Sequence, residues 1–95
     1  MVSGPQAAGR IVPVYPRKAR RKGHEGAVSV EVLVSENGRV AEAAVIDSSG
    51  HGELDDAALD AARSAVFSPA TVDGSAVSGR LKLKFDFRLQ DGGSR

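Results

Sequence analysis

The sequence predicts an α+β domain of two layers in the order α-β-β-α-β, with a three-stranded antiparallel sheet and two helices on one face. Two alternating stretches and one helical stretch support this fold class. Residues 26–35 and 80–89 alternate between apolar and polar side chains, as strands with one buried face do. Residues 53–67 instead place Leu and Ala at the spacing of one helical face.

The N-terminal part predicts little regular structure before a short helix. Residues 1–9 are expected to be a remnant of a linker or of a cloning addition, with the domain at 10–90 and a flexible tail at 91–95. Residues 10–16 (RIVPVYP) contain two prolines, which favour an extended surface segment over a central strand. The last of these prolines suits the first turn of a helix over residues 17–22, and the next residue, a glycine, suits its end.

A β-hairpin is expected next. Asn37-Gly38 predicts a type I′ turn, which needs a positive φ at both residues. The strand before the turn is regular, with Val28, Val30, Val32 and Val34 on one face. The strand after it, residues 39–47, alternates poorly, so we expect a bulge near Ala41–Glu42.

The helix of residues 53–67 and the last strand should form one structural unit. The acidic residues in the first helical turn complement the helix dipole, and Pro69 is expected to stop the helix. Because the apolar helical face is mostly Ala, large side chains of the last strand must complete the core: Leu81, Leu83, Phe85, Phe87 and Leu89. Asp73-Gly74 predicts a turn before this strand. We expect the strand to pair with residues 26–35 and to leave its other side unpaired.

Composition excludes several classes of function. The 95 residues carry a net charge of +1 and no Cys, which argues against a dedicated nucleic-acid binder and against thiol chemistry. The phenylalanines of the last strand lie on its core side, so they cannot form a stacking platform for bases. No apolar run approaches the ~20 residues of a membrane span, and no signal peptide is present, so any anchor would lie outside this chain. We expect no enzymatic activity and no cofactor.

Three polar clusters have alternative interpretations. Ser48, Ser49, His51 and either Asp55 or Asp56 could form a hydrolase site, but a polar turn before a helix is the favoured interpretation. A metal could be held by His24, Glu25, His51, Glu53 and Asp55, but the spacing matches no recognised site, so we expect solvated loop residues and no metal. A polyanion could contact the basic run Arg17, Lys18, Arg20, Arg21 and Lys22, although a solvated helix face is favoured.

Short motifs in a fixed order resemble the TonB C-terminal domain family over residues 13–89. They are Tyr15-Pro16, Ala19, Gly26, Asn37-Gly38-Arg39-Val40, Ser48-Ser49-Gly50, Leu54-Asp55-x-Ala57-Ala58, Phe67-x-Pro69 and the FxF of the last strand. The resemblance implies the periplasmic domain of a single-pass inner-membrane energy transducer, whose missing N-terminal part meets a proton-motive complex. It also implies binding to the TonB box of outer-membrane transporters for iron chelates, haem or cobalamin.

The expected partner-binding site combines the last strand with the proline-containing segment. A transporter peptide would add a strand along residues 80–89, and the segment would close over it. The site residues are Val12, Pro13, Val14, Tyr15, Arg80, Lys82, Lys84, Asp86 and Arg88. The basic side chains on this edge should discourage self-pairing, so we expect a monomer with a possible strand-exchanged dimer. The alternative function is an envelope scaffold whose basic helix binds an acidic polymer such as peptidoglycan.

Overall fold

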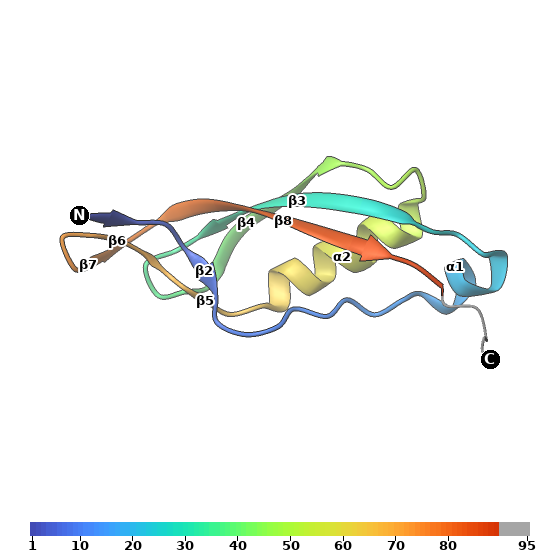
Figure 1. The fold of residues 1–95 in the computed structure, drawn as a ribbon, viewed down its shortest axis with the longest axis horizontal. Helices are drawn as coiled ribbons and strands as arrows, with labels where there is room; N and C mark the ends of the chain where they lie inside the picture. Colours follow the sequence, from blue (N-terminus) through green and yellow to red (C-terminus); the bar gives the residue numbers. More distant parts are fainter. Residues whose placement is uncertain (90–95) are drawn as a thin grey trace.

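A three-stranded antiparallel sheet in the order β4–β3–β8 runs through the centre of the molecule (Figure 1). In the computed structural model, which describes residues 1–89, β3 spans Gly26–Val34, β4 spans Val40–Asp47 and β8 spans Gly79–Phe87. Strands β3 and β8 pair over nine residues without a register shift. The predicted α+β fold and the pairing of the last strand with the first strand of the hairpin are confirmed.

Two helices contribute to the core on one side of this sheet. α2 (Gly52–Ser64) packs on β3 and β4, and α1 (Arg17–Lys22) lies at one end of the molecule (Figure 1). The α1 boundaries agree with the prediction, since Gly23 ends the helix in the left-handed conformation with φ 71°. No helix within residues 1–89 is long and apolar enough to cross a membrane.

The core joins branched side chains of the sheet to small side chains of the helices. All four valines predicted on one face of β3 are fully buried, as are Leu54, Ala58 and Ala62 of α2. Ala19 of α1 is also fully buried, and Phe85 and Phe87 close the β8 side. Short alanine side chains let α2 approach the sheet closely, so the valines and phenylalanines fill the layer between them.

Strand β4 is irregular, as predicted. Leu33 lies opposite Glu42 while Val34 lies opposite Val40, so Ala41 is an extra residue on β4. A second register shift lies near the end of β4. Ser29 pairs with Asp47 and Val30 pairs with Val45, so Ile46 is also an extra residue. The expected bulge near Ala41–Glu42 is therefore confirmed, and the sequence analysis missed the second one.

The hairpin turn differs from the predicted type I′ geometry. Of the two turn residues only Gly38 has a positive φ (84°), and its N–H donates to Ser35 O at 2.9 Å. The Ser35 N–H in turn donates to Arg39 O at 2.8 Å. This pattern is a three-residue hairpin loop that ends in a left-handed glycine. The Asn37 side chain stabilises it by accepting from the Arg39 N–H at 3.0 Å.

The long helix ends earlier than predicted. It was expected to reach Phe67, but α2 stops at Ser64 and Ala65 is already extended. Phe67 belongs to β5 (Phe67–Ser68); its side chain is buried, and its N–H donates to Gly38 O at 2.9 Å. This long-range hydrogen bond and the burial of the ring replace the last helical turn.

A second, smaller β region extends one end of the molecule (Figure 1). β6 (Ala70–Val72) and β7 (Ser75–Val77) form a hairpin, and the intervening Asp73 and Gly74 have φ values of 51° and 84°. The turn expected there is confirmed, and its two positive φ values match a type I′ hairpin.

The first nine residues, expected to be a linker remnant, lie against this region. β1 (Val2–Ser3) pairs with β6, and β2 (Gln6–Ala7) pairs with β5. The N-terminal ammonium also lies 2.5 Å from a carboxylate oxygen of Asp73. The domain boundaries stay a prediction, and the expected tail at 91–95 lies outside the described residues.

Candidate partner-binding edge

The outer side of β8 is an open strand edge. Within residues 1–89, β8 pairs only with β3, so its opposite backbone edge is left without a partner strand. The pairing with β3 has no bulge, so β8 keeps a single register along its whole length. An unpaired edge of this kind offers backbone N–H and C=O groups to an added strand.

Side chains along β8 divide between the core and solvent as the alternation predicts. Phe85 and Phe87 are buried and Leu81, Leu83 and Leu89 are half-buried. The predicted partner-binding residues of this edge are all exposed: Arg80, Lys82, Lys84, Asp86 and Arg88. Arg80 lies 3.6 Å from the carboxylate of Glu31 on β3, in a solvent-exposed ion pair. Four of the five exposed side chains are basic, so the edge carries positive charge.

The other half of the predicted site, Val12–Tyr15, is extended as expected but lies beside α2. Ile11 and Tyr15 pack against the core, while Val12 and Val14 are 69% and 80% exposed. The Tyr15 ring meets the Phe87 ring of β8 edge to face, with centroids 5.5 Å apart. Tyr15 is therefore the residue that joins this segment to the last strand.

Hydrogen bonding and burial fix Tyr15 in place. Its hydroxyl donates to the backbone oxygen of His24, and the guanidinium of Arg20 lies 5.1 Å from the ring centroid. Burial raises the pKa of the Tyr15 phenol, the negative charge of Glu25 adds to the rise, and Arg20 partly opposes it. The phenol therefore stays protonated and donates its hydrogen bond at neutral pH.

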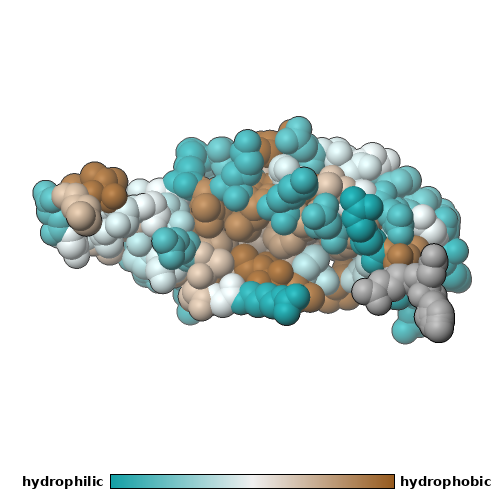
Figure 2. Space-filling view, in the orientation of Figure 1, coloured by the Kyte–Doolittle hydropathy of each residue, from teal (hydrophilic) through white to brown (hydrophobic). Residues whose placement is uncertain are grey.

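A groove of about 880 Å³ separates this segment from α2. Val12 and Val14 line one wall, and Ala57 and Ala61 line the other. The exposed valines thus face the α2 groove, and no β8 residue lines it. On the face drawn in Figure 2, apolar surface lies in the middle of the molecule between hydrophilic patches above and below. Sequence reasoning missed the groove because it depends on where the segment lies against the helix.

The basic run forms the exposed surface of α1. Its five charged side chains are all exposed, and Ala19 alone of the helix is buried. Three of them, Arg20, Arg21 and Lys22, lie in the last turn, where the helix dipole favours positive charge. This is the solvated face that the sequence analysis favoured; polyanion binding stays a prediction.

The candidate hydrolase residues form a hydrogen-bonded loop before α2. The Asp55 carboxylate accepts from the Ser49 N–H at 2.9 Å and from the hydroxyls of Ser48 and Ser49. Burial alone would raise the pKa of Asp55, but these hydrogen bonds outweigh it and lower the pKa. Ser49 Oγ also lies 3.0 Å from the backbone oxygen of His51, which competes with Asp55 for its one proton, and no hydrogen bond within residues 1–89 joins Ser49 to the His51 ring. The cluster therefore acts as the polar turn that the sequence analysis favoured.

Three of the five candidate metal ligands come together. His24 Nδ1 lies 2.5 Å from a carboxylate oxygen of Glu53, and the rings of His24 and His51 stack with centroids 3.9 Å apart. The expectation of solvated loop residues is wrong for these three, which are half-buried and in contact with one another. It fails because the start of β3 and the start of α2 are neighbours only in the folded chain. Glu25 instead accepts from the Leu89 N–H, at 2.7 Å.

Comparison with known proteins decides the family. The model of the Gram-negative bacterial TonB protein C-terminal family matches residues 11–89, which cover both strands of the hairpin, α2 and the β8 edge. The chain belongs to the TonB C-terminal family. The resemblance read from the short sequence motifs is therefore confirmed.

TonB proteins of several bacteria are similar to this chain. Protein TonB of Xanthomonas campestris pv. campestris is 42% identical over 77 residues, which are 81% of this chain and 34% of that protein. Protein TonB of Vibrio cholerae is 36% identical over 81 residues, 85% of this chain and 33% of that protein. The chain thus spans about a third of the length of these TonB relatives.

A solved TonB domain also has the same fold. The solution NMR structure of the Pseudomonas aeruginosa TonB C-terminal domain aligns with a TM-score of 0.76 and 27% identity. The alignment covers 94% of this chain and 90% of that domain. The α+β architecture is therefore that of a TonB C-terminal domain.

Proposed function

We propose that this chain is the transporter-binding domain of a TonB-like energy transducer, and that it binds a short transporter peptide, the TonB box, as an added strand on β8. The observation that carries the proposal is the open β8 edge, which is paired with β3 over nine residues on its inner side and with no strand of residues 1–89 on its outer side. Family membership supports the transducer role. The domain that we propose is a binding and force-transmitting module and not an enzyme.

Strand addition suits a transducer that serves several transporters. Backbone hydrogen bonds make few demands on the sequence of the added peptide. The mainly basic side chains beside the edge favour a peptide with nearby acidic residues, and they disfavour pairing of two β8 edges. Tyr15, which contacts Phe87 of β8, would place the Val12–Tyr15 segment next to the bound peptide.

The wider role rests on the family. In the full-length protein, an inner-membrane anchor before this domain would meet the proton-motive complex, and this domain would act in the periplasm. The energy would reach outer-membrane transporters for iron chelates, haem or cobalamin. These transporters are the partners that we propose for the β8 edge.

Amide chemical-shift mapping with a peptide from the N-terminus of such a transporter tests the binding mode. We expect micromolar affinity, because ordering a flexible peptide offsets much of the gain. Shifts should concentrate on residues 80–89 and on Val12–Tyr15, and β4 should stay unchanged. A matched peptide with one central proline should lose most of the binding, since proline removes a backbone donor from the added strand.

Two outcomes would contradict strand addition. Equal affinity for the proline peptide would show that the peptide does not pair with the β8 backbone. Shifts centred on α1 that fade with salt would indicate electrostatic attachment to its exposed basic side chains. In that case, co-sedimentation with purified peptidoglycan, lost when the α1 charges are neutralised, would favour the envelope-scaffold function.

A further inference from the structure

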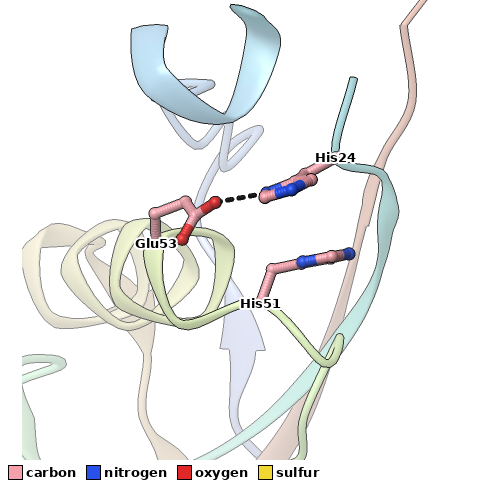
Figure 3. Close-up of side chains that lie close together, drawn as sticks. All are labelled: His24, His51 and Glu53. Carbon is pink, nitrogen blue, oxygen red and sulfur yellow. Dashed lines mark hydrogen bonds and ion pairs between the residues drawn. The ribbon is translucent and has the colours of Figure 1, made fainter. Parts of the chain in front are cut away.

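Two imidazoles and one carboxylate converge at the junction between β3 and α2 (Figure 3). His24 comes from the turn before β3, His51 is the N-cap residue of α2, and Glu53 lies in the first turn of α2. One nitrogen of each histidine and one carboxylate oxygen all lie within 4.8 Å of one another. The side chains of His24 and Glu53 are 28% and 29% exposed, so an ion could reach them from solvent.

We propose that His24, His51 and Glu53 bind a divalent transition metal ion, with Zn²⁺ as the favoured ion. Two imidazoles and one carboxylate are a known zinc ligand set, and water would complete a tetrahedral site. Mg²⁺ and Ca²⁺ prefer oxygen ligands, so this nitrogen-rich set selects against them.

The backbone on both sides of the site is already held in place. The His24 N–H donates to Ala19 O at 2.9 Å, and the Tyr15 hydroxyl donates to His24 O. The His51 N–H donates to the Ser49 hydroxyl at 3.1 Å, and that hydroxyl also bonds the Asp55 carboxylate. Metal binding therefore requires side-chain movement only, which keeps the entropic cost of forming the site low.

The movement needed is small. Ligand atoms on one tetrahedral zinc lie about 3.3 Å apart, so closing a 4.8 Å gap takes a shift of roughly 1.5 Å. The stacked rings are nearly parallel, at 13°, whereas a metal must lie in the plane of each ring it binds. One ring must therefore rotate, and terminal torsions of imidazoles are soft. The hydrogen bond between His24 and Glu53 is exchanged for two bonds to the metal.

The carboxylate is available as a ligand at neutral pH. A glutamate side chain is ionised at neutral pH, so its carboxylate oxygens carry the negative charge that a metal ligand needs. The chain has two histidines and no cysteine, so imidazole-dependent zinc binding can arise only here. A bound ion would clamp the turn before β3 to the first turn of α2.

Titration of the untagged chain with zinc chloride tests the site. Calorimetry should give one ion per chain, and the ring resonances of both histidines should shift together in NMR spectra. At a zinc concentration about 100 times Kd, Tm should rise by roughly 10–20 °C, because the ion binds only the folded chain. Magnesium chloride at the same concentration should leave Tm unchanged.

Variants separate the metal site from a purely structural contact. His51→Ala and Glu53→Gln should each weaken zinc binding at least tenfold, whereas Glu42→Gln, an exposed carboxylate on β4, should bind zinc as the natural chain does. His51→Ala removes the stacking contact with His24 but no side-chain hydrogen bond of residues 1–89, so this variant should still fold.

Three results would overturn the proposal. The first is an unchanged Tm and no binding heat at millimolar zinc. The second is undiminished zinc binding by His51→Ala and Glu53→Gln, and the third is a zinc-linked dimer with one ion per two chains.

Discussion

The two edges of the main sheet, β4 and β8, differ in regularity. β8 keeps one register with β3 over nine residues, whereas β4 carries two extra residues, Ala41 and Ile46, against the same strand. Each bulge interrupts the backbone pattern and twists the strand locally. Although both strands have an open outer side in the described part of the chain, only β8 presents an uninterrupted one.

The cause of the difference lies in the side-chain order of the two strands. β8 alternates strictly between large apolar and charged residues, so every second side chain enters the core without adjustment. β4 places Val40 and Val45 at an odd spacing, and both pack against the core only because Ala41 bulges out between them. A sheet can thus protect one edge from strand addition and leave the other open.

The largest expected effect is on the core side of β8. Phe85→Ala should lower the free energy of unfolding by ~3–5 kcal/mol, because the ring is buried at 6% exposure and its removal leaves a cavity. Ile46→Ala, at a β4 bulge and 43% exposed, should cost under ~1 kcal/mol. Urea unfolding of both variants measures the contrast. Equal losses would show that the two strands contribute alike to the core.

The hairpin that joins β3 to β4 should be the next most sensitive point. An added Cβ at Gly38 would lie 2.3 Å from Phe67 O, and φ there is +84°. Gly38→Ala should therefore cost ~2–3 kcal/mol, from left-handed strain plus a forced backbone shift.

Gly50→Ala is the matched control, since φ is +91° there but no atom lies within 4 Å of the added Cβ. It should cost only ~1 kcal/mol. If urea midpoints fell equally for both variants, the contact between the hairpin and Phe67 would not contribute to stability.

The exit from β4 should be the acid-sensitive part of the structure. Hydrogen bonds from the Ser48–Ser49 loop hold the pKa of Asp55 below its ordinary value of 3.8, despite burial that raises it. Because the pKa is lowered on folding, the ionised Asp55 carboxylate stabilises the folded state. This stabilisation is complete above about pH 4 and is lost as pH falls through the folded-state pKa. Asp55→Asn should cost about 1 kcal/mol at pH 7, and the difference from the natural chain should shrink as pH falls below the ordinary pKa of 3.8.

Amide hydrogen exchange of Asp55→Asn compares the loop after β4 with the β8 edge. Amides of residues 48–52 should exchange faster in Asp55→Asn, while those of β8 should not. Asp56→Asn, at the exposed neighbouring position, is the control and should change neither. Faster exchange along β8 would mean that the loop and the open edge unfold as one unit.

The smallest effect on stability is expected on the exposed face of β8. Lys82→Ala should change the free energy of unfolding by less than about 0.5 kcal/mol, because the side chain is exposed. Peptide binding should respond differently. Lys82→Glu together with Lys84→Glu should weaken an acidic transporter peptide several-fold at low salt and less at high salt. Unchanged peptide affinity at low salt would show that these charges do not contribute to recognition of the peptide.

Local chemistry in the sequence determined most of the main sheet and both helix starts. Alternating valines in β3 and alternating Leu and Phe in β8 can bury one face only as paired strands. Pro16 and Gly23 mark the two ends of α1. Proline suits the start of a helix because it has no backbone N–H that would be left without a partner, and glycine suits the end because it readily adopts a positive φ. The irregularity of β4 was visible as an odd spacing of its valines. The open β8 edge followed from these elements, so its exposed residues could be named in advance.

The tertiary structure decided the features that depend on long-range contacts. α2 ends at Ser64 because Phe67 is held by Gly38, 29 positions earlier in the chain, and no local signal encodes that hydrogen bond. The Asn37-Gly38 turn takes a different loop geometry from the one that its residue types favour. The Val12–Tyr15 segment lies beside α2 because Ile11 and Tyr15 share the core, and this creates the groove. His24 meets Glu53 only where the start of β3 and the start of α2 pack together, since spacing along the chain carries no information about neighbours across a fold.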